Sequence, residues 1–407
     1  MKCRGCNKEV NNIFLDLGVT PPSNAFLNKK NQKEKIYPLK VFFCNNCYLV
    51  QTVDFASRKE LFNKDYVYFS GYADTWKAHL DKFVIDMEKK NLINQKSGSF
   101  IVEIASNDGS LQEILEKKKY NSLGIEPTKS TAKVAKKKGL KVIQKFFGKD
   151  LATSLKKKFS PDLIVANNVM AHVPDINDFI SGLKVLLKKS GVITVEFQHL
   201  LNIIKKRQFD TIYHEHYSYL SLISAQKIFL KHNLEIYDAE EISTHGGSLR
   251  IFIKHKNNLS KKRTSNYKRI FLKEKKYGLN RKKTYENFQK KVELIKKNFL
   301  KFLIKKKSKK KTFVAYGAAA KGNTFFNFLD LNYKSIDYII DKNPIKIGKF
   351  LPGSKIEVKK ELILKKKKPD YILIMPWNIK DEVIKQLRYI KKWNAKFITA
   401  IPNIKIY

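Results

Sequence analysis

Short apolar runs and amphipathic stretches alternate along the central part of the chain. The apolar runs have the length of buried strands, and the amphipathic stretches repeat their apolar residues every three or four positions, as helices do. Strands that alternate with helices of about 10–15 residues predict a parallel, doubly wound α/β sheet. We expect strands at 99–105, 121–126, 140–146, 161–170 and 192–197, and helices at 110–118, 128–139 and 175–191.

The same kind of pattern organises the rest of the chain. Residues 71–95 predict a helix, and 234–242 with 246–254 predict a closing antiparallel pair of strands. One long amphipathic helix is expected in the Lys-rich segment 256–310, because its apolar residues step by three and four. That stripe consists of Tyr285, Phe288, Val292, Ile295, Phe299 and Phe302.

A second α/β run follows this helix and predicts a C-terminal Rossmann-like domain. Its strands are expected at 312–317, 335–341, 371–377 and 395–402. The chain is therefore divided into an N-terminal region of 1–70, a central α/β domain of 71–255 and a C-terminal domain of 256–407.

Four cysteines stand in two CxxC pairs near the start of the chain. Cys3 and Cys6 form "CRGC", and Cys44 and Cys47 form "CNNC". Two such pairs can complete a tetrahedral site, so we expect a structural zinc ion and a small zinc-binding domain. The segment between them, "LGVTPPSNAF", must then bulge outward. Two redox-active pairs are the alternative, but no thioredoxin-like βαβ pattern surrounds either pair.

The net charge of +45 changes the picture less than its size suggests. Of the 82 basic residues only 8 are Arg, and the 74 Lys are spread along the whole chain. Sequence-specific nucleic-acid readers favour Arg for bidentate contacts. We interpret the lysines as a solvated surface that would still attract an anionic substrate, and we expect no nucleic-acid partner. No apolar run approaches the ~18 residues of a membrane span, and no secretory signal opens the chain, so a cytoplasmic location without a membrane partner is expected.

The first strand–loop–helix unit, "VEIASNDGSLQEIL", has the features of a nucleoside site. Asn107 and Asp108 fill the turn, and Gly109 opens the helix. The G-x-G-x-x-G pattern that a pyrophosphate requires is absent. Glu103 lies near the end of the first strand, and Glu126 ends the next, where an acidic group suits a ribose diol. This favours an adenosyl cofactor with a cationic tail over NAD; the alternative is a plain βαβ turn with a capping Asp.

A second glycine-bearing loop, "VAYGAAAKGNTFF", opens the C-terminal α/β run. Gly317 and Gly322 come near the dinucleotide fingerprint, and Asp341 ends the next strand. Such a loop can bind NAD or the pyrophosphate of a nucleotide sugar, with Lys321 as the countercharge. Tight helix–strand packing without a ligand is the alternative.

The most unusual segment is "DTIYHEHYSYLSL", residues 210–222, which places two histidines, a glutamate and three tyrosines close together. It is either a surface loop or an acid/base site.

The motifs along the chain, taken in order, resemble the family of S-adenosylmethionine-dependent sugar C-methyltransferases over essentially the whole length of the chain. The motifs that carry the resemblance are "CRGC…CNNC", "VEIASNDGSL", "NNVMAHVPD", "DTIYHEHYSY", "THGGSLR" and "VAYGAAAKGN".

The resemblance implies a substrate and a mechanism. Members of this family methylate a ring carbon of keto-deoxysugars on a nucleoside diphosphate, and the best-known act at C3 of dTDP-linked 4-keto hexoses. A ketone acidifies the neighbouring C–H, so a base can form an enolate that accepts the methyl group. By resemblance His216 is the base, Tyr213 and Glu215 orient it or relay protons, and His172 and Asn168 face the same cleft.

The remaining polar residues of these motifs are expected to bind the two ligands. S-adenosylmethionine would be held by Glu103, Asn107, Asp108, Gly109, Glu126, Asn167 and Asn168. The nucleotide sugar would be held by His245, Gly247, Arg250, Lys321, Asn323 and Trp377, with Arg250 pairing either a phosphate or a carboxylate.

Two rival classes remain open. A zinc-bearing nucleic-acid methyltransferase or binding module would use the cysteines and the charge, but it leaves "YHEH" and the second α/β run unexplained. An NAD-dependent sugar oxidoreductase would use the 317–322 loop, but such enzymes normally place that fold first and use a Tyr–Lys pair. In every case we expect a monomer or a weak oligomer.

Overall fold

The structure is a computed structural model that describes residues 1–55, 61, 71 and 74–407. The boundary that we predicted after residue 70 lies outside these described residues. The helix predicted for 71–95 is described as α2, Asp74–Lys89. Domain limits at 70 and 255 stay predictions.

The N-terminal sheet adjoins both cysteine pairs: one pair precedes its first strand, and the other lies between its second and third strands. Its order is β1-β2-β3-β9, and all its pairings are antiparallel. The fourth strand comes from the segment 210–222, far along the chain. The strands are β1 (Asn12–Thr20), β2 (Tyr37–Phe43), β3 (Val50–Thr52) and β9 (Ser218–Tyr219).

The central sheet has the doubly wound form that the sequence predicts. Its order is β10-β11-β8-β7-β4-β5-β6, parallel except for the antiparallel strands β10 and β11 at one edge. The strands are β4 (Phe100–Ile104), β5 (Asn121–Ile125), β6 (Val142–Ile143), β7 (Leu163–Asn167), β8 (Val192–Gln198), β10 (Leu234–Ile242) and β11 (Ser248–His255). The helices are α3 (Ser110–Lys117), α4 (Lys129–Lys137), α5 (Lys149–Lys156), α6 (Ile176–Leu186), α7 (Leu200–Lys205), α8 (Leu222–Lys231) and α9 (Ser265–Tyr277).

The C-terminal sheet repeats this organisation with the order β14-β13-β12-β15-β16-β17. Its strands are β12 (Phe313–Tyr316), β13 (Ile339–Ile340), β14 (Val358–Lys359), β15 (Tyr371–Ile374), β16 (Lys396–Thr399) and β17 (Lys405–Ile406). Its helices are α12 (Ala320–Phe328), α13 (Ile363–Lys367) and α14 (Lys380–Gln386).

The prediction of a single long helix around 285–302 is wrong, because the segment is divided between two helices. The chain forms two helices, α10 (Lys282–Glu286) and α11 (Phe288–Lys307), which meet at Asn287. Tyr285 belongs to the first and stacks on Phe43 with ring centroids 4.9 Å apart. A three-to-four spacing therefore continues across a helix break, because both helices bury the same side against β1 and β2.

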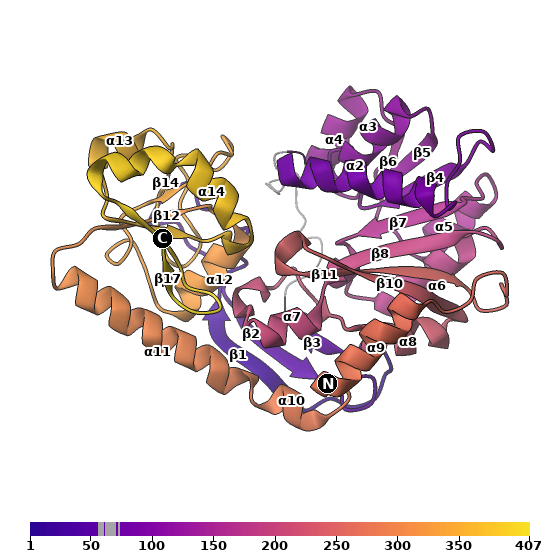
Figure 1. The fold of residues 1–407 in the computed structure, drawn as a ribbon, viewed down its shortest axis with the longest axis horizontal. Helices are drawn as coiled ribbons and strands as arrows, with labels where there is room; N and C mark the ends of the chain where they lie inside the picture. The colour runs from indigo at the N-terminus through magenta and orange to yellow at the C-terminus, as the bar shows by residue number, and fades with distance from the viewer. Residues whose placement is uncertain (56–60, 62–70, 72–73) are drawn as a thin grey trace.

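The N-terminal region shares one hydrophobic cluster with the C-terminal sheet and another with the central sheet. Figure 1 shows β1 and β2 between the central part and the C-terminal part, with α11 along the lower edge. One hydrophobic cluster contains residues of β1, α7, α11 and α12 together. The loops at the carboxyl ends of the two parallel sheets are therefore held close to each other. Within the described residues, no helix combines the length and the apolar character that a bilayer span requires.

Candidate active site

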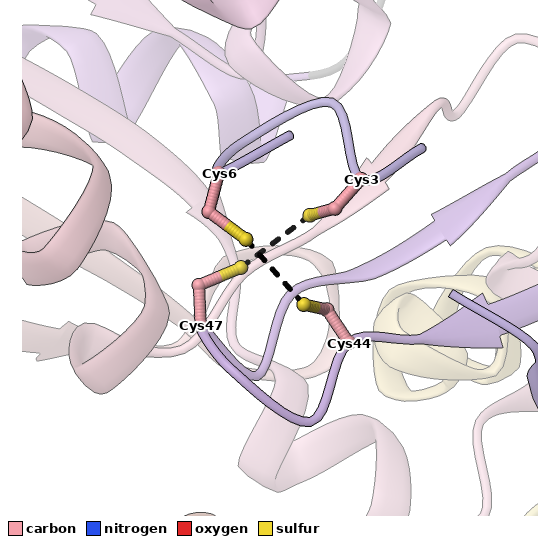
Figure 2. A group of neighbouring side chains, drawn as sticks. All are labelled: Cys3, Cys6, Cys44 and Cys47. Carbon is pink, nitrogen blue, oxygen red and sulfur yellow. Dashed lines mark hydrogen bonds between the residues drawn. The ribbon is translucent and has the colours of Figure 1, made fainter. Parts of the chain in front are cut away.

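The four cysteines converge on one point, as Figure 2 shows. The Sγ atoms of Cys3 and Cys47 are 3.5 Å apart, those of Cys6 and Cys44 are 3.6 Å apart, and all four lie within 4.8 Å of one another. Sulfurs on a tetrahedron with Zn–S bonds of about 2.3 Å would be about 3.8 Å apart. The residues therefore fit a zinc ion, and four thiolates leave it no open position for catalysis.

A first cavity lies at the carboxyl ends of β4, β5 and β7, where a parallel α/β sheet binds its ligand. α2 covers it with Trp76, and Phe147 adds a second apolar wall. Both amide atoms of Asn167 lack a hydrogen-bond partner among the described residues. Of the predicted cofactor residues, those that line the cavity are Glu103, Asn107, Glu126, Asn167 and Asn168.

The charge of this cavity suits a cationic ligand. Desolvation raises the pKa of Glu103 well above its usual value, and the charges of Asp108 and Glu126 raise it further. The Oε2 atom of Glu103 has no hydrogen-bond partner in the part of the chain that the structure describes. S-adenosylmethionine carries a sulfonium and an ammonium group, which would relieve this concentration of negative charge. The cavity therefore fits that cofactor.

Glu126, which we predicted as the ribose ligand, presents its carboxylate at the wall of this cavity. Its Oε2 accepts a hydrogen bond from the backbone N–H of Asn107 at 2.9 Å, and its Oε1 accepts one from Thr128 at 2.7 Å. Each carboxylate oxygen can accept a further bond. The two N–H groups fix the carboxylate at the cavity wall.

Asp108 and Gly109 shape the turn and do not line the cavity. Asp108 accepts hydrogen bonds from the Ser110 hydroxyl at 2.7 Å and from the Gly71 N–H at 3.0 Å. Gly109 has φ +79°, and a Cβ there would lie 2.2 Å from Leu140. Both residues therefore support the loop that carries Asn107.

We expect Glu126→Ala to weaken cofactor binding by about 1–3 kcal/mol, the usual scale for losing hydrogen bonds to a charged group. Calorimetric titration with S-adenosylmethionine would measure the change. Glu113→Ala is the control, because Glu113 lies on the neighbouring helix and pairs with Lys138 at the surface. An unchanged dissociation constant would remove Glu126 from the binding site.

A second cavity opens beside the first and shares Asn168 and His172 with it. "YHEH" contributes Tyr213 and His216, and the C-terminal part contributes Lys321. A small molecule in this cavity would therefore touch both the cofactor side and the C-terminal part. The other predicted residue that lines it is His245.

Two histidines face each other at the junction of the cavities. The His216 Nδ1 atom lies 2.9 Å from the Thr211 carbonyl oxygen, and the His172 Nδ1 atom lies 2.8 Å from that of Glu215. Because a carbonyl only accepts, each Nδ1 carries the proton and each Nε2 keeps a basic lone pair. The two rings have their centroids 4.6 Å apart, and Tyr213 packs on His216 at 4.0 Å.

The surroundings keep these imidazoles neutral. Desolvation lowers the pKa of His172 to about 4. The pKa of His216 falls well below its usual value through desolvation and then through the nearby His172. His245, whose Nε2 lies 3.3 Å from the Asn168 amide nitrogen, also has its pKa lowered by desolvation, to about 4. At neutral pH each is a base and none is an acid.

Among the described residues, Lys321 and Lys346 are the two lysines that line the second cavity, and Lys321 is the one that we predicted. Its Nζ donates to Asn378 Oδ1 at 3.0 Å and lies 4.6 Å from the ring centroid of Trp377. Desolvation lowers its pKa. The Trp377 indole donates to the buried Asp210 at 2.6 Å, so Trp377 packs behind the wall that Asn378 forms.

Four further predicted residues do not line the cavity, and each makes another contact within the protein. Arg250 is buried and donates to Glu196 at 2.7 Å, so it pairs with a carboxylate. Asn323 is buried and donates to the Ser23 carbonyl. A Cβ at Gly247 would lie 2.4 Å from an Asn202 side chain, so its backbone packs against α7. Glu215 is buried, and its Oε1 accepts a hydrogen bond from the Asn24 amide.

Sequence reasoning missed several residues of the cavity walls. Asn24 and Lys346 enter the second cavity from distant loops, and Gln198 from the end of β8. Trp76, from the helix predicted at 71–95, lines the first cavity. Only Gln198 had a signal in the sequence, since it directly follows the strand predicted at 192–197.

Comparison with known proteins agrees with this arrangement. Three family models match in order: "Putative zinc binding domain" at 3–62, "Methyltransferase domain" at 76–239 and "C-methyltransferase C-terminal domain" at 243–402. The chain is 27% identical over 409 residues to the C-methyltransferase NovU of Streptomyces niveus, covering 100% of this chain and 96% of that protein.

Solved structures match over less than half of the chain. The magnesium protoporphyrin IX methyltransferase of Synechocystis with bound SAM is 15% identical, with a TM-score of 0.33, over 44% of this chain and 78% of that one. A methyltransferase from Clostridium acetobutylicum is 14% identical, with a TM-score of 0.35, over 45% and 93%. The three family models and the similarity to NovU lead to one conclusion: the chain is an S-adenosylmethionine-dependent C-methyltransferase with a zinc-binding domain at its N-terminus.

Proposed function

We propose that this C-methyltransferase acts on a ring carbon beside the keto group of a nucleoside-diphosphate-linked deoxysugar, C3 of a dTDP-linked 4-keto hexose. The observation that carries the proposal is the junction of the two cavities at Asn168 and His172. A base and a cofactor site meet there, and carbon methylation needs both. Lys321 and Lys346 on the C-terminal side suit the phosphates of such a carrier.

The residues of the second cavity have different roles in the reaction. The Nε2 atom of His216 removes the proton beside the ketone, and the negative charge moves to the ketone oxygen as an enolate forms. Cations and hydrogen-bond donors in the cavity stabilise that oxygen. The bound cofactor supplies an electrophilic methyl group. Packing of Tyr213 and His172 against His216 holds the imidazole in place.

The test is a reaction of the full chain with S-adenosylmethionine and a dTDP-linked 4-keto-deoxyhexose. Mass spectrometry should show a sugar heavier by one methylene unit and an equal amount of S-adenosylhomocysteine. A parallel reaction with DNA and RNA should give no methylated product. Methylated nucleic acid without methylated sugar would contradict the proposal in favour of the nucleic-acid alternative.

Lys321→Met should raise the KM for the nucleotide sugar about 10-fold to 100-fold, because a hydrogen bond to a charged group is worth about 1.5–3 kcal/mol. Methionine keeps most of the side-chain volume and removes the charge. The KM for S-adenosylmethionine should stay the same, since Lys321 lines only the second cavity. Lys301→Met is the control, because Lys301 is exposed on α11. Equal KM values for the two variants would place the phosphates elsewhere.

A further inference from the structure

The segment between the two cysteine pairs reaches the catalytic cavity. Asn24, from "LGVTPPSNAF", lines the second cavity beside Tyr213 and His216. Its Nδ2 donates to the Oε1 of Glu215 at 3.0 Å. A residue of the zinc-binding region therefore contacts the "YHEH" motif directly, 191 residues away along the chain.

Contacts on both sides hold this segment in place. The Asn323 amide of α12 donates to the Ser23 carbonyl, and the Thr324 hydroxyl donates to the Ile212 carbonyl at 2.9 Å. Leu27 forms an isolated antiparallel bridge with Phe350, with N–H···O distances of 2.9 and 2.8 Å. α12 thus joins the loop to the catalytic motif, and these hydrogen bonds hold the loop that carries Asn24.

Glu215 is the group that depends on this contact. It is 1% exposed, and its Oε2 has no hydrogen-bond partner among the described residues. Burial raises its pKa, while hydrogen bonds, including that of the Asn24 amide, oppose the rise. The titratable groups that face it are Tyr219, whose pKa it raises, and His172, which donates to its backbone carbonyl.

We propose that Asn24 is a positioning residue that acts through Glu215: its amide fixes the orientation and the charge state of this carboxylate, which belongs to the residue next to the base His216. The zinc-binding region then contributes part of the catalytic site besides its metal. Without the amide donor, the buried carboxylate would lose the only side chain that donates to it within the described residues. The carboxylate would then hold a proton more tightly.

The first test needs no substrate. Infrared titration of the full chain, with Glu215→Gln as the reference that assigns the signal, gives the pH at which Glu215 binds its proton. Asn24→Ala should raise this midpoint by about one to two pH units, the shift that matches a lost hydrogen bond to a charged group. Asn24→Asp, which keeps the volume, should raise it as well, because two adjacent carboxyls share a proton. Ser23→Ala, in the same loop, should leave it unchanged.

The second test is kinetic and rests on the proposed function. With the dTDP-linked keto sugar, Asn24→Ala should lower kcat about 10-fold or more and leave the KM for S-adenosylmethionine unchanged. In the Glu215→Gln background, Asn24→Ala should cost nothing further, because it acts through Glu215.

The two tests separate the two ideas. An unchanged Glu215 midpoint in the folded Asn24 variants overturns the role of Asn24, even where the sugar is methylated. A shifted midpoint in a protein that leaves the sugar untouched supports the role of Asn24 and overturns the proposed substrate. Additive losses of kcat in the double variant would also overturn the role of Asn24, because they would show that it does not act through Glu215.

Discussion

Replacing His216 by Asn should lower turnover by about 10²–10⁴-fold, the usual contribution of a positioned general base. The affinity for S-adenosylmethionine should hardly change, because His216 lines the second cavity and not the first. Exchange of the proton beside the substrate ketone with heavy water, followed by NMR with S-adenosylhomocysteine bound, should be lost as well. This measures proton removal separately from methyl transfer.

His214→Asn is the matched control for this variant. His214 lies two residues away in the same motif, is 5% exposed, and faces the Tyr37 carbonyl with its Nε2 at 3.3 Å. It should retain close to full turnover. If His216→Asn exchanges and methylates at the wild-type rate while His172→Asn does not, the base is His172.

The pH dependence of kcat/KM follows from the pKa of His216. Because desolvation and the neighbouring His172 lower the pKa of His216, its imidazole is already deprotonated at pH 7. The acid limb of the kcat/KM profile should therefore lie below pH 6.5, the ordinary pKa of a histidine. Activity should persist as the pH falls from 7 to 6.5 and disappear only as His216 gains a proton.

Cys44→Ser should abolish zinc binding and unfold the N-terminal sheet. Structural zinc sites in small domains contribute about 10–16 kcal/mol of apparent binding free energy at pH 7, which is as large as the whole stability of a typical domain. Metal analysis should fall from one zinc per chain to near zero, and calorimetry should show the loss of an unfolding transition. Asn45→Ser is the control, because Asn45 is an exposed residue in the same knuckle. One zinc retained by Cys44→Ser at an unchanged unfolding temperature would contradict a four-cysteine site.

The fold could be predicted from the sequence because its main signals are local. Buried parallel strands give uninterrupted apolar runs, and the helices between them repeat every three to four residues. The positions along the chain of the strands β4 to β8 and of the antiparallel pair β10 and β11 followed from this, whereas their spatial order in the sheet was not predicted. The break at Asn287 did not, since the apolar stripe runs on through it.

The site was predictable where it depends on strand ends. Glu126 follows the parallel strand β5 and Asn167 ends the parallel strand β7, and such ends meet at one edge of the sheet. The sequence does not give the direction of a side chain within a motif, so Arg250 and Asn323 were expected in a cavity from which they are absent. Asn24 could not be found because the partners of Asn24 and of the adjacent Ser23 come from parts of the chain about 190 and 300 residues away.

The pairing of β3 with β9 has a consequence for synthesis in the cell. Val50 pairs with Tyr219, so the N-terminal sheet lacks its last strand until more than 160 further residues have left the ribosome. At about 5–20 residues per second this interval is on the order of ten to thirty seconds. Both cysteine pairs emerge long before it ends, so zinc can bind while β3 is still an open edge. Such an edge invites pairing with other chains, and a nascent chain stalled before residue 218 should therefore aggregate more readily than one stalled after residue 222.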